Sequence, residues 1–234
     1  MTGAALGFSI MNALIRAGSL ELPAIQIVFF RNAFALVFML PWLARAGVAG
    51  LRTGRLGFHA LRSTIGLIAM TCWFYSVTLL PLAQAVSLNY TVPLFATVGA
   101  ALVLGETVRA RRWTATIVGF LGVLAIVRPG FQEVTPAMAL PILAAIFMAT
   151  AALLIKSLSN TENPNAMVFY MNLFLTPMSL VPALFVWVWP SWEVLGLMAL
   201  VGGLATCAHL MLTRAYAKAD ASAVIPFHYM QLPF

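Results

Sequence analysis

Residues 63–105 read STIGLIAMTCWFYSVTLLPLAQAVSLNYTVPLFATVGAALVLG, and this stretch contains no charged side chain. It is roughly twice as long as the ~20 apolar residues that one membrane-spanning helix requires. Pro81 lies near its middle, within the sequence LLPLAQA. Because proline ends or kinks a helix, the stretch predicts two consecutive membrane-spanning helices that meet in a turn near Pro81.

The composition of the whole chain agrees with this prediction. Of the 234 residues, 62% are hydrophobic and 8% are charged, whereas a soluble domain usually has about 25% charged residues. A soluble domain is therefore excluded, and so is a disordered chain, which requires low hydrophobicity. The two cysteines, Cys72 and Cys207, both lie in apolar runs and provide no disulfide framework. The class that remains is an all-α, multi-pass membrane protein.

Further apolar runs of spanning or nearly spanning length occur on both sides of residues 63–105. They are residues 1–15, 22–43, 112–127, 134–155, 163–192 and 194–213, followed by an apolar run at 221–234. A secretory signal peptide is the alternative for residues 1–15, but this segment lacks a basic start. The total is eight spans and the beginning of a ninth.

The net charge of +7 is explained by the membrane topology. Lys and Arg gather in the cytoplasmic loops of membrane proteins. One orientation of the chain places ten of the thirteen basic residues inside: Arg45, Arg52, Arg55, Arg62, Arg109, Arg111, Arg112, Lys156, Arg214 and Lys218. This orientation predicts a cytoplasmic N-terminus. No basic stripe indicates a nucleic-acid partner, and the lipid bilayer is the expected surrounding.

The chain contains an internal repeat with an offset of 140 residues. At this offset Phe29, Asn32 and Phe34 coincide with Phe169, Asn172 and Phe174, and residues 83–93 coincide with 223–233. Each copy would contain five spans, and an odd number of spans gives the two copies opposite orientations in the membrane. Inverted repeats of this kind are typical of secondary carriers. The offset also predicts that the second copy is incomplete, lacking most of its fourth span and all of its fifth.

Several motifs resemble one family. They are Arg31 inside the second span, PLAQAVSLNYTVPLF at 81–95, LGE at 104–106, and WTATIVGFLGVLAIVRPG at 113–130. Together they resemble the EamA family of the drug/metabolite transporter superfamily, and within it the carriers that include riboflavin and S-adenosylmethionine importers. The resemblance implies two inverted five-helix EamA repeats, here at 1–130 and 134–234, around a central cavity. It also implies transport of a small metabolite across the bacterial inner membrane.

Arg31 is the most informative single residue. A guanidinium inside a span costs ~2.5–3.5 kcal/mol on insertion scales unless it faces a cavity or a partner. Arg31 is therefore either a contact for a carboxylate or phosphate of the substrate, or a structural arginine that bonds backbone carbonyls or reaches the interface.

Other polar and aromatic side chains recur at helical spacing on the predicted spans. They either contact substrate or bond one helix to another, as such residues often do in membranes, and aromatic members could stack on a planar ligand. The candidate substrate-binding residues are Arg31, Asn12, Asn32, Tyr75, Asn89, Tyr90, Asn172, Thr176, His209, His228 and Gln231. Small residues should allow close helix approach at Gly119, Gly122, Gly196, Gly202 and Gly203.

The acidic residues all lie at span ends or in loops, so a carboxylate proton relay is not supported. His209 and His228 are the mid-span groups that titrate near neutral pH; they either couple transport to protons or are neutral, hydrogen-bonded histidines. The sequence has no catalytic motif and no metal-ligand spacing, so we expect no catalytic residues, no metal and no cofactor.

The sequence therefore predicts a secondary transporter that moves a small metabolite by alternating access. A homodimer is a possible assembly. The alternatives are an intramembrane lipid-modifying enzyme, which would need a nucleophile or carboxylate set, and a non-transporting accessory subunit, which would not need an inverted repeat.

Overall fold

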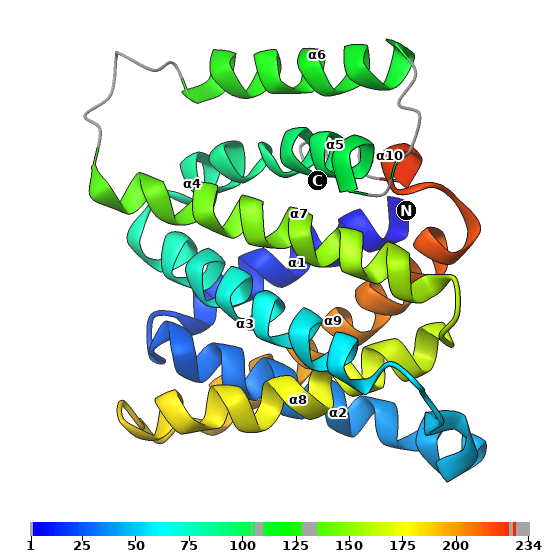
Figure 1. The fold of residues 1–234 in the computed structure, drawn as a ribbon. Helices are drawn as coiled ribbons and strands as arrows, with labels where there is room; N and C mark the ends of the chain where they lie inside the picture. The colour runs from blue at the N-terminus through cyan, green and yellow to red at the C-terminus, as the bar shows by residue number, and fades with distance from the viewer. Residues whose placement is uncertain (1, 104, 106–109, 128–134, 225–226, 228–234) are drawn as a thin grey trace.

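A computed structural model describes residues 2–103, 105, 110–127, 135–224 and 227. All regular structure within this part of the chain is helical, which confirms the predicted all-α class (Figure 1). The elements are α1 (Thr2–Gly18), α2 (Ala24–Ala46), η1 (Val48–Leu51), α3 (Leu56–Leu79), α4 (Leu82–Asn89), α5 (Val92–Val103), α6 (Ala110–Val127), η2 (Pro136–Met138), α7 (Ala139–Ser159), α8 (Pro164–Leu184), α9 (Trp192–Lys218) and α10 (Ala221–Val224).

Among the described residues, five segments are long and apolar enough to cross a bilayer. They are α2, α4 together with α5, η2 together with α7, α8, and α9. The exposed large side chains of these helices are mainly apolar, for example Val37, Phe38 and Leu200. Since contact with lipid carries no penalty for such side chains, this surface fits a multi-pass bundle.

The turn at Pro81 lies where the sequence predicts it, between the end of α3 and the start of α4. The fourth predicted span, however, is not one continuous helix. It breaks at Tyr90 and Thr91, directly before α5. Pro93 explains the break, because proline has no N–H to donate and its ring would collide with the carbonyl of residue 89 in a continuous helix.

The predicted span at 163–192 is too long. Asn163 caps α8 by accepting a hydrogen bond from the Asn165 N–H at 2.9 Å, and the helix ends at Leu184. The following residues run to Ser191, which caps α9. Gln26 holds this connection, because its side chain accepts from the Val188 N–H at 3.0 Å and donates to the Val188 carbonyl. These bonds satisfy backbone groups that a helix would otherwise pair.

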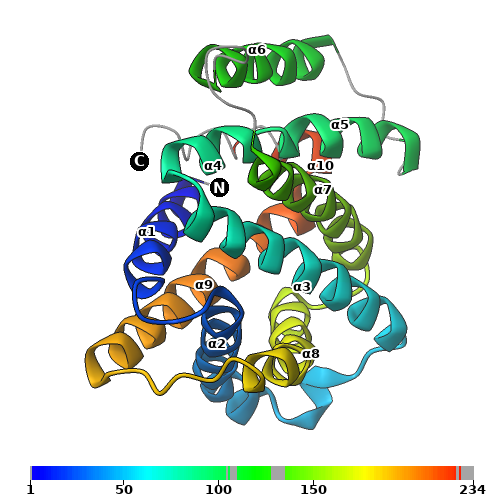
Figure 2. The ribbon, with the colours of Figure 1, turned by 90° about the vertical axis from the view of Figure 1, so that its left-hand side faces the viewer.

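The first and second halves of the chain interleave. Helix α3 packs on α7, α2 packs on α8 and α9, and α1 packs on α9. Helix α6 lies at the edge of the bundle against α4 and α5 (Figures 1 and 2). A shift of 140 residues brings the bounds of α1, α2 and α3 to within four residues of those of α7, α8 and α9.

Gly202 on α9 allows a close approach to α2. A Cβ at this position would lie 2.5 Å from the Phe34 Cβ and 2.9 Å from the Ala35 backbone nitrogen on α2. This confirms the prediction of close helix approach at Gly202. The prediction was wrong at Gly196 and Gly122, where an added Cβ would meet nothing within 4 Å.

Candidate functional site

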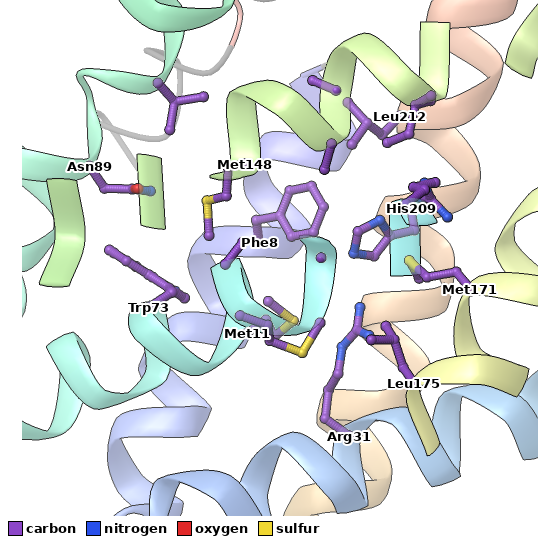
Figure 3. A pocket seen from close by; sticks show the side chains of 18 of the residues that line it. Phe8, Met11, Arg31, Trp73, Asn89, Met148, Met171, Leu175, His209 and Leu212 are labelled. Atoms are coloured by element: carbon purple, nitrogen blue, oxygen red, sulfur yellow. The ribbon is translucent and has the colours of Figure 1, made fainter. Parts of the chain in front are cut away.

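A cavity of about 170 Å³ lies inside the bundle. Its wall combines residues of α1, α2, α3, α4, α5, α7, α8 and α9, so helices from both halves of the chain enclose it. Figure 3 shows Arg31 and His209 on one side of the cavity and Trp73 and Asn89 on the other. Such a concave site with a largely apolar wall and a few polar groups is the usual form of a small-molecule site.

Arg31 is fully enclosed, with 1% of its surface exposed, and its guanidinium lines the cavity. Its Nη1 donates to the Asn32 Oδ1 and, at 3.4 Å, to the Asn172 Oδ1. Asn172 is itself oriented by donating to the Val168 carbonyl at 2.9 Å. The two asparagines that coincide in the 140-residue repeat therefore both accept from the same guanidinium nitrogen.

His209 lines the same part of the cavity. Its ring meets the Phe8 ring edge-on, with 5.2 Å between the centroids. The His209 Nδ1 is buried and has no hydrogen-bond partner. An unpaired buried nitrogen is costly, so this atom can gain a bond from a ligand or a water in the cavity.

The opposite side of the cavity is aromatic and amide-rich. The Trp73 indole N–H donates to the Asn12 Oδ1 at 3.1 Å, and this bond fixes the plane of the indole ring. Asn89 also lines the cavity, and its Oδ1 is buried without a hydrogen-bond partner. Four methionines complete the wall: Met11, Met70, Met148 and Met171. Thioether side chains are polarisable and adapt to the shape of a bound molecule.

Arg62 is a cavity residue that the sequence analysis missed. The prediction placed it in a cytoplasmic linker, but it lies in α3 with 3% exposure and lines the cavity. Its Nη1 donates to the Met167 carbonyl at 3.4 Å. The linker is shorter than predicted because α3 begins at Leu56. The spacing of three residues from His59 to Arg62 and of four from Arg62 to the cavity residue Gly66 was the available signal, since it places them near one helix face.

The structure brings some of the predicted residues together and separates others. Arg31, Asn12, Asn89 and His209 line the cavity, and Asn32 and Asn172 lie directly behind Arg31. Tyr75 does not reach the cavity and is 39% exposed on α3. Tyr90 is buried outside the cavity wall. His228 and Gln231 lie outside the described residues.

The hydroxyl residues mainly bond within their own helices. Thr176 donates to the Asn172 carbonyl at 2.8 Å, and Ser179 donates to the Leu175 carbonyl at 2.6 Å. Thr206 joins two helices as well, because it donates to the Gly202 carbonyl at 2.9 Å and contacts the Ala35 carbonyl at 3.3 Å. Thr176 therefore satisfies its own hydroxyl within α8. Within the described ranges, no three His, Cys, Asp or Glu side chains gather in a way that could hold a metal ion.

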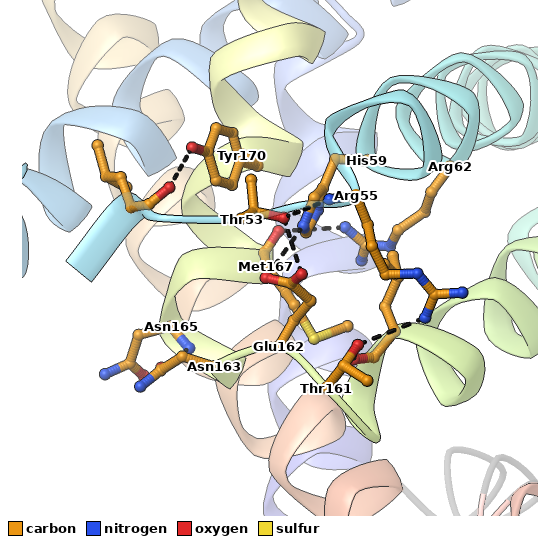
Figure 4. Close-up of polar contacts among 12 residues, drawn as sticks. Thr53, Arg55, His59, Arg62, Thr161, Glu162, Asn163, Asn165, Met167 and Tyr170 are labelled. Carbon is orange, nitrogen blue, oxygen red and sulfur yellow. Dashed lines mark hydrogen bonds and ion pairs between the residues drawn. The ribbon is translucent and has the colours of Figure 1, made fainter. Parts of the chain in front are cut away.

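A polar cluster closes one end of the bundle (Figure 4). The Glu162 carboxylate, on the α7–α8 connection, accepts from the Thr53 hydroxyl at 2.7 Å and lies 3.7 Å from the His59 Nε2. We call Glu162, Thr53 and His59 the Glu162 clasp. The Arg55 guanidinium supports it by donating to the Ser157 carbonyl at 3.3 Å. The clasp ties the α2–α3 connection of the first half to the α7–α8 connection of the second half.

A second polar contact closes the opposite end. The Glu21 carboxylate, on the α1–α2 connection, accepts from the Ser191 hydroxyl at 2.9 Å and from the Ser191 N–H. We call Glu21 and Ser191 the Glu21 clasp. It ties the α1–α2 connection to the α8–α9 connection, and these connections lie at the left of the bundle in Figure 1, with the Glu162 clasp at the right. The two clasps have the same arrangement. Glu21 precedes α2, the second helix of the first half, and bonds the connection before α9, the third helix of the second half. Glu162 precedes α8, the second helix of the second half, and bonds the connection before α3, the third helix of the first half.

In the part of the chain that the structure describes, the helical bundle and its apolar outer surface define a multi-pass membrane protein. The sequence profile of the EamA-like transporter family matches residues 1–128. The chain belongs to this family, which confirms the resemblance seen in the motifs. It is a small-molecule membrane transporter rather than an enzyme.

Individual relatives match 91% or more of the chain. A riboflavin transporter of Vibrio cholerae is 37% identical over 100% of this chain and 80% of its own length. An S-adenosylmethionine uptake transporter of Rickettsia prowazekii is 30% identical over 91% of this chain and 72% of its own length. A solved crystal structure shares the fold with a TM-score of 0.80 at 17% identity, covering 98% of this chain and 82% of that one.

Proposed function

We propose that the chain is a secondary transporter that moves a planar metabolite across the bacterial inner membrane by alternating access. The binding site is the cavity lined by Arg31, Asn12, Asn89 and His209, and the two inverted repeats are residues 1–130 and 134–234. Residues of both halves line the cavity, as expected for a site between two repeats. The positive-inside rule favours a cytoplasmic N-terminus, and this orientation places the Glu162 clasp at the cytoplasmic face.

Riboflavin is the first candidate substrate. The similarity over the full chain to a riboflavin transporter is the observation that carries this proposal. The cavity chemistry supports it, because the Phe8 and Trp73 rings and the methionines offer flat, polarisable surface to a planar ring. The unpaired Asn89 Oδ1 and His209 Nδ1 offer hydrogen bonds to the polar edge of such a ring.

The two clasps are the gates of this transporter. Alternating access requires that the cavity open to one side while the other side is closed. Each clasp ties the first half of the chain to the second at one end of the bundle, so breaking one clasp frees that end alone. Both clasps are formed in this structure.

Uptake of labelled riboflavin into proteoliposomes tests the proposed function. We expect saturable uptake by the protein, and an uptake affinity lowered about tenfold by Trp73→Leu, since stacking of a ring on an aromatic side chain contributes ~1–3 kcal/mol. The matched control is Trp192→Leu, which removes an indole that is 88% exposed at the start of α9 and should leave uptake unchanged.

The proposal fails if folded protein shows no riboflavin uptake above that of empty liposomes. If the two tryptophan variants behave alike while the protein itself transports riboflavin, transport stands but the cavity is not its binding site.

A further inference from the structure

Two guanidinium groups face the cavity without a carboxylate partner. Arg31 and Arg62 both line it and are 1% and 3% exposed. No Asp or Glu lines the cavity in the part of the chain that the structure describes. The described acidic residues all lie on connections or at helix ends: Glu21, Glu162, Glu193 and Asp220.

The partners of both guanidinium groups are neutral. Arg31 donates to the amide oxygens of Asn32 and Asn172, and Arg62 donates to the Met167 carbonyl at 3.4 Å. The Nε–H of each group is buried and has no hydrogen-bond partner. Each guanidinium carries five N–H donors, so these few acceptors leave donors free for a ligand.

Two uncompensated positive charges at one cavity are unfavourable on their own. Neutral acceptors solvate a guanidinium but do not cancel its charge, and a low-dielectric surrounding strengthens the repulsion between like charges. An anion bound between the two groups would remove this repulsion and pair the free Nε–H donors. Charged residues inside membrane segments usually face the bundle interior or a cavity, and they mark substrate and ion paths.

We propose that the cavity also takes an anion and prefers it to neutral riboflavin: a planar ring that bears a carboxylate or phosphate group, held between Arg31 and Arg62. This inference rests on the proposed function and adds a charge preference at the same site. The ring lies toward Trp73 and Asn89, on the side of the cavity opposite Arg31 (Figure 3). A cationic metabolite is disfavoured at this site, because it would add a third positive charge.

The charge preference can be measured with three flavins that share one ring. These are riboflavin, which is neutral; flavin mononucleotide, which bears a phosphate; and a 10-carboxymethyl flavin, which bears a carboxylate. Binding to the purified protein is followed by quenching of flavin fluorescence. We expect one or both anionic flavins to bind roughly 10- to 100-fold more tightly than riboflavin, the range expected for hydrogen bonds to a charged group. The stronger of the two identifies the anion.

Arg62→Gln and Arg31→Gln should each reduce this preference about tenfold while riboflavin still binds. Retained riboflavin binding shows that the variants are folded. Arg62→Lys keeps the charge and should keep most of the preference. The matched control is Arg52→Gln, which removes an exposed positive charge on the α2–α3 connection and should change nothing.

Equal binding of all three flavins would overturn the anion proposal and leave the proposed riboflavin transport intact. A preference for the anionic flavins that survives in both glutamine variants would also overturn it. Failure of all three flavins to bind would overturn this proposal and the proposed substrate together.

Discussion

Replacing Gly202 by leucine is expected to lower the apparent melting temperature of the protein by roughly 5 to 10 °C. Even the first added carbon would lie 2.5 Å from the Phe34 Cβ and 2.9 Å from the Ala35 nitrogen. Neither atom can move aside by a rotamer change, so α2 and α9 must separate. Overpacking of this kind typically costs ~1–3 kcal/mol. Loss of signal in size-exclusion chromatography after heating would measure the shift in detergent.

Alanine substitutions make the test sharper, because the expected change in stability has a different sign at two positions of the same helix. Gly202→Ala should destabilise the protein through the collision with α2. Gly196→Ala should leave stability unchanged or raise it, since nothing lies within 4 Å of the added carbon and alanine favours a helix over glycine by ~1 kcal/mol. Equal melting temperatures for the two alanine variants would show that α2 and α9 do not meet at Gly202 as described.

Much of the fold could be predicted because a membrane helix is defined by length and by the absence of charge. The turn at Pro81 and the helices that flank it follow from residues 63–105 alone. The break at Tyr90 and Thr91 was missed because the prediction took residues after Pro81 as one apolar run and did not use Pro93 as a helix breaker. The end of α8 was missed for a different reason. It depends on Gln26, a residue far away in the sequence, which pairs the backbone of Val188.

The cavity was harder to predict than the fold. Arg31 was found because a guanidinium in the middle of an apolar span is conspicuous. Arg62 was missed because it borders several other basic residues, and hydropathy alone assigns such a group to a loop. Tyr75 and Asn12 are both polar or aromatic residues on spans, yet only Asn12 lines the cavity. To distinguish them, one must know how each helix is rotated about its axis. That rotation is set by packing against neighbouring helices.

Breaking the two clasps is expected to open the cavity to opposite sides of the membrane. Glu162→Ala removes the acceptor of the Thr53 hydroxyl and the carboxylate beside His59, which frees the α2–α3 connection. Glu21→Ala removes both bonds to Ser191 and frees the other end. Ala152 lines the cavity, so a single cysteine at this position, in a background of Cys72→Ser and Cys207→Ser, reports access to it. An impermeant thiol reagent is then applied to either face of sealed vesicles.

Glu162→Ala should raise the labelling rate about tenfold from the face where the Glu162 clasp lies, because a charged hydrogen bond contributes ~1.5–3 kcal/mol. Glu21→Ala should raise labelling from the opposite face, and by less, because this clasp is exposed to solvent and exposed charged contacts are weak. Glu193→Ala is the matched control. It removes an exposed carboxylate in the first turn of α9, next to the Glu21 clasp, that belongs to neither clasp.

Labelling that rises from the same face in both clasp variants would contradict the assignment of two opposed gates. Opposite changes would mean that each clasp restricts access to the cavity from one side of the membrane, as alternating access requires.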